Sequence, residues 1–185
     1  MNIEEARTFA RSKCEKDTTY RHLVSVEGVM RALATDRFAA DGEDPELWAL
    51  TGLFHDLDQD QTDDKPDEHA RLAAGWLREA GVDERVVNGV LAHAYEEYRT
   101  DRMSHAVVNA DAIAGLLVAA ALVRPEKATG MKVSSVRKKL KDKAFAPGVN
   151  RDEVSSVEDS IGLSVDELIE TGIAGLQRVA PEIDL

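Results

Sequence analysis

Apolar residues recur at helical spacing along most of this chain, whereas the strict alternation expected of strands is nowhere sustained. In residues 20–38, for example, Leu23, Val26, Met30 and Leu33 fall on one face of a helix. No internal repeat and no low-complexity tract interrupts this pattern. The sequence therefore predicts an all-α protein.

Capping and helix-breaking residues divide the chain into successive helices. Thr18 or Thr19 is the expected cap of the second helix, and Ser104 is the expected cap of the sixth. Pro66 suits the first turn of the fourth helix. The acidic segment 58–67 is expected to be a loop. The expected helices cover residues 3–14, 20–38, 45–55, 66–80, 83–93, 106–123 and 165–179.

The composition changes after the sixth predicted helix. Residues 124–143 contain eight Lys or Arg residues and only two acidic residues. Such a stretch is most often a solvated helix face, and phosphate binding is the alternative. No domain boundary is evident, so we expect a single domain over residues 1–185. Its core would span about residues 18–125, followed by a C-terminal helical extension over about 126–185.

Helix-start signals also occur in the C-terminal part of the chain. Asn150 and Glu153 have the spacing of a capping box, and so do Ser164 and Glu167. The helix over 165–179 carries apolar residues at helical spacing. We therefore expect this last helix to pack on the same core as the helices before it.

Composition and charge narrow the possible classes of function. The 185 residues are 43% hydrophobic, which is ordinary for a globular protein. The net charge of −12 argues against DNA or RNA as a partner and against docking on an anionic membrane. We expect no membrane-spanning segment, since Asn109 and Asp111 interrupt the longest apolar stretch. Cys14 is the only cysteine and no secretory signal is evident, so we expect a cytoplasmic protein.

A His-Asp pair after an apolar run is the first candidate for chemistry. The largely apolar residues 50–54 lead directly into His55 and Asp56. A carboxylate in hydrophobic surroundings is costly unless it is paired or bound to a metal, and an imidazole beside it suits a divalent cation. Asp111 lies within the apolar helix over 106–123, where an isolated ionised carboxylate would also be costly. A metal ion is the simplest cation that keeps Asp111 charged.

The remaining histidines extend this picture. His22, His69 and His93 lie on three further predicted helices, whereas His105 at a helix start is expected to be a surface residue. Imidazoles on separate helices can converge only if these helices pack around a shared centre. A helix bundle allows this, because metal sites in bundles are built from facing side chains.

In this order, His22, His55-Asp56 and Asp111 resemble the H…HD…D signature of the HD-domain superfamily of metal-dependent phosphohydrolases. The stretch GLFHDLD is similar to the HDIG subgroup, although Leu-Asp stands where that motif has Ile-Gly. Two further stretches also resemble the small stand-alone HDIG proteins of bacteria and archaea, namely RHLVSVEGVMRALA and ADAIAGLLVAAALVRPEK. The resemblance covers most of the chain, including the tail SSVRKKLKDKAFAPGVNR. It implies an HD-domain helical bundle with additional C-terminal helices.

The resemblance also implies a set of metal ligands. In HD proteins with two metals, two further histidines lie between the HD pair and the final Asp, and one Asp bridges the two ions. Such sets carry one or two divalent ions, which can be Fe, Mn, Zn, Ni, Co or Mg. The geometry of the site, and not the sequence, distinguishes among these metals. The implied ligands are His22, His55, Asp56 and Asp111 for the first metal, and His69, His93 and the bridging Asp56 for the second.

The activity implied by the resemblance is hydrolysis of a phosphate ester bond in a small phosphorylated metabolite, such as a nucleotide. A metal-bound hydroxide would attack the phosphoryl group, and Lys or Arg would stabilise the charge that develops on its oxygens. Arg21, Arg124 and Lys127 are the candidates for binding the substrate. Asp56 and Asp58 are the candidates for catalysis, since Asp58 is placed to orient the water or to support a histidine.

Other interpretations of the same residues stay open. Asp58, Asp60, Asp63 and Asp64 more simply form a solvated acidic loop. Two-iron HD proteins similar to inositol oxygenase use the same kind of six-ligand set to activate oxygen, so an oxygenase is a second hypothesis. A third is a non-catalytic, nucleotide-binding regulatory module that retains the metal ligands. An oligomer is possible if the basic stretch contacts the acidic body of a neighbouring chain.

Overall fold

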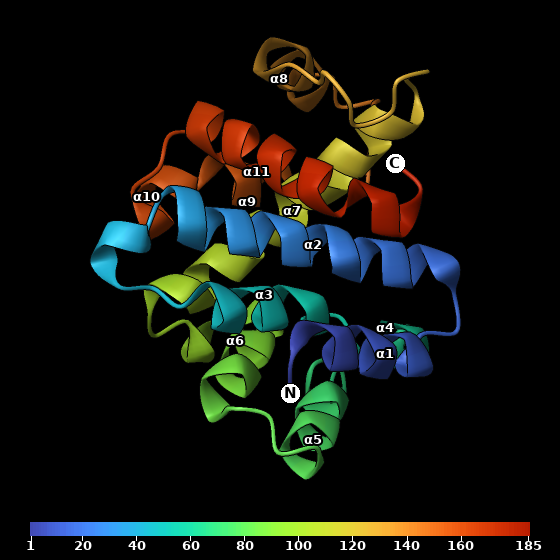
Figure 1. The fold of residues 1–185 in the computed structure, drawn as a ribbon, viewed down its shortest axis with the longest axis vertical. Coiled ribbons are helices and arrows are strands. Elements are labelled where there is room, and N and C mark those ends of the chain that lie inside the picture. Colours follow the sequence, from blue (N-terminus) through green and yellow to red (C-terminus); the bar gives the residue numbers. More distant parts are fainter.

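Every regular element of the protein is helical, as the computed structural model of residues 1–185 shows (Figure 1). The prediction of an all-α fold is therefore confirmed. Short 3₁₀ turns lie at Ala39–Asp41, Glu96–Tyr98 and Ala180–Ile183. The α-helices are α1 (Ile3–Lys13), α2 (Asp17–Asp36), α3 (Pro45–Phe54), α4 (Gln59–Thr62), α5 (Arg71–Glu79), α6 (Glu84–Ala94), α7 (Arg102–Leu122), α8 (Val133–Lys141), α9 (Arg151–Ser155), α10 (Val157–Ile161) and α11 (Val165–Val179).

Helix α2 lies at the centre of the fold, between α11 on one side and α3 on the other (Figure 1). The apolar face that the sequence predicts, including Leu23 and Met30, is fully buried. Val24 and Val29 are buried too, because the two neighbouring helices cover opposite sides of α2. The buried apolar residues form one continuous core from α1 to the C-terminal 3₁₀ turn. Residues at both ends of the chain therefore support the same centre.

Glycines allow α2 to approach both of its neighbours closely. A Cβ atom at Gly28 would lie 2.6 Å from the carbonyl oxygen of Gly175 on α11. On the other side, a Cβ at Gly52 of α3 would lie 2.7 Å from the carbonyl oxygen of Val26. Any larger residue would therefore clash with the backbone of the adjacent helix. The close crossing at Gly52 brings the end of α3 beside α2.

Replacing Gly52 with alanine is expected to destabilise the protein by about 1–3 kcal/mol, because the added methyl group overpacks the α2–α3 crossing. Urea unfolding measures this difference in the free energy of unfolding. Gly75→Ala is the matched control, because a Cβ at Gly75 of α5 meets no atom within 4 Å. It is expected to stabilise the protein by about 0.5–1 kcal/mol through helix propensity. Equal stability of the two variants would contradict the close crossing.

Two helices begin earlier than the sequence predicts. Helix α2 begins at Asp17, so Thr18 and Thr19 lie inside the helix and do not cap it. Helix α7 is capped by Asp101, whose carboxylate accepts a hydrogen bond from the backbone N–H of Ser104 at 2.8 Å. The Ser104 hydroxyl accepts one in return from the Asp101 N–H at 2.9 Å. Ser104 is therefore the reciprocal member of a capping box and not the cap itself.

The fourth predicted helix begins later than Pro66. Helix α5 starts only after Ala70, which adopts a left-handed conformation with φ 62°. His69 therefore lies in the connection before the helix. The cap comes from a distant residue, because the Asp58 carboxylate accepts hydrogen bonds from the N–H groups of Ala73 at 2.8 Å and Ala70 at 3.2 Å. This tertiary contact sets the helix start, and no local sequence signal reveals it.

The acidic segment 58–67 is only partly a solvated loop. Helix α4 occupies its first half, Asp58 is fully buried, and the Asp60 side chain is 1% exposed. The Asp60 carboxylate accepts two backbone N–H hydrogen bonds from the α1–α2 connection, at 2.7 and 2.9 Å. The solvated-loop interpretation is therefore wrong for these two residues. Asp63 and Asp64 are exposed, as that interpretation predicts.

By length and composition alone, α7 is able to cross a membrane. The expectation of no such segment is therefore wrong by this criterion, because the helix starts at Arg102 and stays apolar enough overall despite Asn109 and Asp111. Within the protein, 67% of its most apolar window is buried. Helix α7 packs against α2, α6 and α11, which are the contacts of a core helix.

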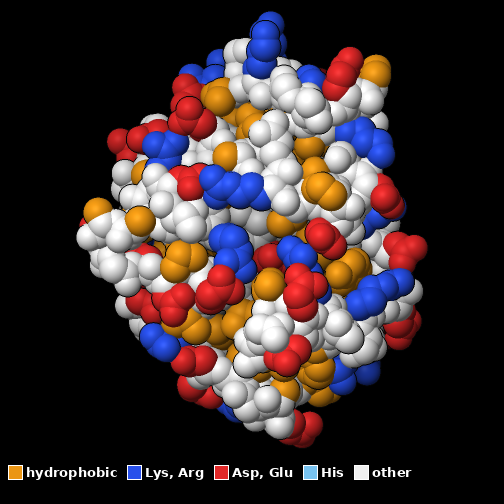
Figure 2. Space-filling model, viewed as in Figure 1, with side chains coloured by type: hydrophobic (Ala, Val, Ile, Leu, Met, Phe, Trp, Pro, Cys, Tyr) orange, Lys and Arg blue, Asp and Glu red, His pale blue; other side chains and the backbone are white.

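The C-terminal helices cover the far side of α2, with α8 outermost (Figure 1). Ser164 and Glu167 form the capping box that the sequence predicts at the start of α11. Basic residues of α8 such as Lys138 are exposed, and Arg137 pairs with Asp166 of α11 at 2.8 Å. Figure 2 shows acidic and basic side chains intermixed over the face formed by α2 and α11. The basic stretch is thus mainly a solvated helix face.

Candidate metal centre

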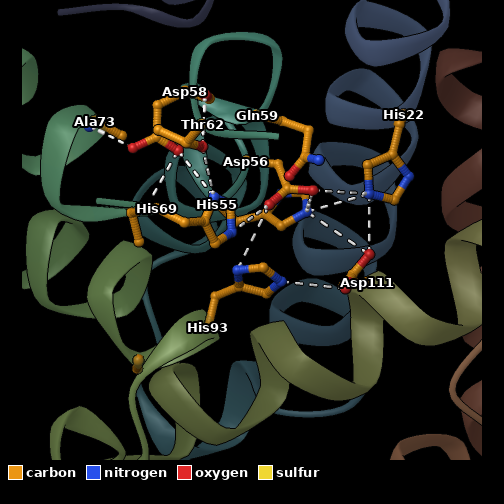
Figure 3. Close-up of polar contacts among 12 residues, drawn as sticks. His22, His55, Asp56, Asp58, Gln59, Thr62, His69, Ala73, His93 and Asp111 are labelled. Carbon is orange, nitrogen blue, oxygen red and sulfur yellow. Dashed lines mark hydrogen bonds and ion pairs between the residues drawn. The ribbon is translucent and has the colours of Figure 1, made fainter. Parts of the chain in front are cut away.

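Six side chains from separate parts of the fold meet at one place, which we call the histidine–aspartate cluster (Figure 3). They converge because α3 and α7 pack against α2, and α6 packs against both α3 and α7. All six are residues that the sequence singles out. The cluster consists of His22 from α2, His55 and Asp56 from the end of α3, His69 from the connection before α5, His93 from α6 and Asp111 from α7.

Four of these side chains form the first group of the cluster. His22 Nε2 lies 2.9 Å from Asp111 Oδ1 and 3.2 Å from His55 Nε2. Asp56 Oδ2 lies 3.6 Å from His55 Nε2 and 3.8 Å from His22 Nε2. Donor atoms that bind one ion at about 2.1 Å are themselves roughly 3.0–3.5 Å apart. The separations in this group are close to those expected around a single ion.

The other oxygen of Asp56 faces a second group. Asp56 Oδ1 lies 3.2 Å from His69 Nε2 and 3.6 Å from His93 Nδ1. Asp56 Oδ1 and His93 Nδ1 are both buried without a hydrogen-bond partner. Such atoms are rare in folded proteins, because an unsatisfied buried polar group costs about 1–3 kcal/mol. A cation held by Asp56, His69 and His93 would satisfy both atoms. The residues present fit a metal centre.

A backbone contact orients His55 toward the first group. Its Nδ1 lies 2.8 Å from the carbonyl oxygen of Gly52, so Nδ1 carries the proton and donates it there. Nε2 is then left with a free lone pair that faces His22 and Asp111 (Figure 3). A hydrogen bond on one ring nitrogen commonly fixes the tautomer that binds metal through the other. The fully buried His55 is thus oriented before any ion binds.

Asp58 orients the ring of His69 in the same way. Asp58 Oδ1 lies 3.1 Å from His69 Nδ1, and the opposite nitrogen, Nε2, faces Asp56. Thr62 Oγ1 also lies 3.2 Å from His69 Nδ1. Asp58 is fully buried behind His69, away from the atoms that face the two groups (Figure 3). Of the two roles expected for Asp58, this position fits support of the histidine, because its carboxylate contacts His69 Nδ1 on the side away from the two groups.

The charges of the cluster favour a cation. Burial lowers the pKa of His22 and His93, but hydrogen bonds to Asp111 and the charge of that carboxylate outweigh burial and raise both pKa values. The carboxylates of Asp56 and Asp58, which lie beside its two ring nitrogens, raise the pKa of His69 to about 10. Burial raises the pKa of Asp56 and of Asp111, yet the surrounding histidines hold both below their ordinary value. The carboxylates are therefore anionic, and a metal ion would displace protons from the histidines.

The three basic residues proposed to bind substrate are engaged elsewhere. Arg21 Nη2 lies 3.4 Å from Asp184 Oδ2, and Lys127 donates to the backbone carbonyl of Asp184. Arg124 donates to the carbonyls of Lys127 at 3.0 Å and Thr129 at 2.8 Å. Neighbouring residues on a helix point about 100° apart, so adjacency to a ligand in sequence does not place Arg21 beside the cluster. None of the three lines the cavity at the cluster.

A cavity of about 290 Å³ opens beside the cluster at His22 and Asp111. Its walls come from α7 and from residues 146–153, which precede and begin α9. Asn150 caps α9 by accepting a hydrogen bond from the Glu153 N–H at 3.4 Å, so half of the capping box that the sequence predicts is present. The sequence gives no sign that these two residues also line a cavity, since they lie far along the chain from the ligands.

Comparison with known families agrees with this geometry. The family model for the HD domain matches residues 19–131, a span that contains the whole cluster. The match confirms the resemblance to the HD-domain superfamily. Residues 132–185 lie beyond the match, and they include the segment that forms one wall of the cavity. No curated protein and no solved structure matches the chain.

Proposed function

Because the chain belongs to the HD-domain family, we propose that it is a metal-dependent phosphohydrolase of the small HDIG type. Its substrate would be a small phosphorylated metabolite, such as a nucleotide. The observation that carries this proposal is the division of Asp56, which presents one oxygen to each of two groups of ligands. Nitrogen and oxygen donors of this kind suit divalent ions such as Fe, Mn, Zn, Ni and Co. A bound divalent ion supplies hydroxide near neutral pH by lowering the pKa of water.

The residues of the chain contribute orientation and charge. Gly52 and Asp58 hold the rings of His55 and His69, so that one nitrogen of each ring stays directed at the cluster. Such supports commonly change metal affinity or activity by about 10–100-fold when they are removed. His55 is fully buried and the other five side chains of the cluster are 15–27% exposed. This partial burial limits competing water and strengthens electrostatic interactions with a phosphoryl group.

The cavity at His22 and Asp111 gives a substrate access to the cluster. Its volume of about 290 Å³ suits a small metabolite better than a polymer. An ester that enters it would bring its phosphorus atom next to the first group of ligands. Its organic part would then lie against residues 146–153.

The test is an assay of protein purified without chelator, whose metal content is measured first. Nucleotides and other phosphate esters are then supplied with added manganese, and released phosphate is measured. We expect turnover by the native protein and a loss of at least about 100-fold in His55→Ala. His105→Ala is the matched control, because His105 lies on α7 outside the cluster. The proposal fails if metal-replete protein shows no turnover or if His55→Ala retains it, and oxygen consumption by iron-loaded protein would favour the oxygenase.

A further inference from the structure

The cavity beside the cluster is closed by a part of the chain outside the HD-domain match. His22 and Asp111 form the end of the cavity at the cluster. Gly115 of α7 lies on one wall and residues 146–153 form the other. A Cβ added at Gly115 would meet only Val149 Cγ2, at 3.6 Å, so the two walls approach each other here. What enters this space therefore contacts residues that lie outside the HD-domain match.

One guanidinium group shapes the segment that forms this wall. Ala146, within this segment, adopts a left-handed conformation with φ 45°, and its carbonyl accepts a hydrogen bond from Arg151. The wall is thus held in one shape by hydrogen bonds within the protein. Arg151 donates at 2.5–3.3 Å to the backbone carbonyls of Leu140, Asp142, Phe145, Ala146 and Val149.

Asn109 fixes the same segment to the helix that carries Asp111. Its Nδ2 donates to the backbone carbonyl of Glu153 at 2.6 Å, and its Oδ1 accepts from the Ser160 hydroxyl at 2.7 Å. Asn109 is 1% exposed and lies two residues before Asp111 on α7. The position of Glu153 is therefore set relative to the cluster and does not depend on a free loop.

The charges on the cavity wall restrict the chemistry of a ligand. Its ionisable groups are His22, Asp111 and Glu153, and Asn150 adds a neutral amide. A phosphoryl group would be met by metal at the cluster, which leaves Glu153 and Asn150 for the organic part. A carboxylate accepts hydrogen bonds from hydroxyl groups, and it repels any additional phosphate. A single phosphoryl group on a hydroxylated organic part fits this arrangement.

We propose that Glu153 selects phosphate monoesters whose organic part carries hydroxyl groups, by accepting hydrogen bonds from these hydroxyls in the cavity. The inference rests on the proposed function, because it takes the histidine–aspartate cluster as the site of the phosphoryl group. Arg151 and Asn109 are positioning residues, since they hold the wall and do not line the cavity.

The test uses two phosphonates that the protein cannot hydrolyse. Butylphosphonate and 3,4-dihydroxybutylphosphonate carry the same charged group and differ only in two hydroxyls. Their dissociation constants are measured by calorimetry with manganese-loaded, full-length protein. We expect the dihydroxy compound to bind about 10-fold more tightly than butylphosphonate, as for a hydrogen bond to a charged acceptor. Glu153→Ala should remove this advantage, and Glu153→Gln, which keeps an acceptor, should retain part of it.

Asp63→Asn is the matched control, because Asp63 is an exposed carboxylate that lines a second cavity on the His69 side of the cluster. It should leave both dissociation constants unchanged. Equal binding of the two phosphonates, or an advantage that survives Glu153→Ala, overturns the inference. An advantage lost only in Asp63→Asn overturns it too, by placing the ligand in the other cavity. If neither phosphonate binds to metal-loaded protein, the proposed function fails and the inference falls with it.

Discussion

Replacing Asp56 with asparagine is expected to lower the metal content of both groups of the cluster and to reduce turnover by about 10³-fold or more. Asp56 Oδ2 faces His22 and His55, whereas Oδ1 faces His69 and His93. Asparagine keeps the shape of the side chain, but it loses the negative charge and presents an NH₂ donor to one group. Metal analysis by mass spectrometry and phosphate release measure the two effects.

Two further variants make this result specific. His69→Ala removes a contact of the second group only, so it should retain metal at the first group. Asp64→Asn changes an exposed carboxylate of the same connection and should retain full metal content and turnover. Native metal content in the Asp56→Asn protein would contradict the division of its two oxygens. Unequal losses in Asp56→Asn and His69→Ala would support it.

Some residues of the cluster could be predicted from local signals in the sequence, and the full ligand set followed from the family resemblance. His55 and Asp56 follow an apolar run at a helix end, and Asp111 interrupts an apolar helix. The all-α fold follows from apolar spacing that is helical nearly throughout. The order of these residues along the chain supplied the family resemblance, which the HD-domain match over residues 19–131 confirms.

What the sequence did not reveal consists of contacts between distant segments. Asp58 looks like one acid among several, yet it is buried because it caps α5 and holds His69. Gly52 has no sequence pattern that marks a helix crossing, since the crossing depends on which backbone lies opposite. Glu153 showed only the spacing of a helix start. Tertiary packing gave each of these residues a second role that periodicity and capping rules do not describe.

A buried ion pair between α1 and α2 is another contact between distant segments that the sequence does not reveal. Glu27 lies on the buried surface of α2 and is 1% exposed. Arg7 of α1 binds it through two hydrogen bonds, from Nε at 2.9 Å and from Nη2 at 3.0 Å. Burial raises the pKa of Glu27 even though Arg7 lowers it, so the carboxylate depends strongly on this partner. Helix α1 is held to the core by this pair as well as by its apolar residues.

Arg7→Met is therefore expected to destabilise the protein by about 3–5 kcal/mol at neutral pH, because it leaves a buried carboxylate without its partner. An acid whose pKa is raised by folding binds its proton more tightly in the native state, so stability falls as pH rises above its ordinary value. Without Arg7 the pKa of Glu27 rises further. The deficit should accordingly be larger at pH 8 than at pH 5. Urea unfolding at both pH values measures it.

Comparison with an exposed ion pair tests whether burial of Glu27 causes the loss of stability in Arg7→Met. Arg11 Nη2 lies 2.6 Å from Asp17 Oδ1, but the two side chains are 47% and 80% exposed. Arg11→Met should therefore lower the free energy of unfolding by less than about 1 kcal/mol. The double variant Arg7→Met with Glu27→Leu should recover much of the lost stability, because a buried ion pair is often replaceable by apolar residues of similar volume. If the double variant is no more stable than Arg7→Met, then the loss comes from packing of the Arg7 side chain and not from the unpaired charge of Glu27.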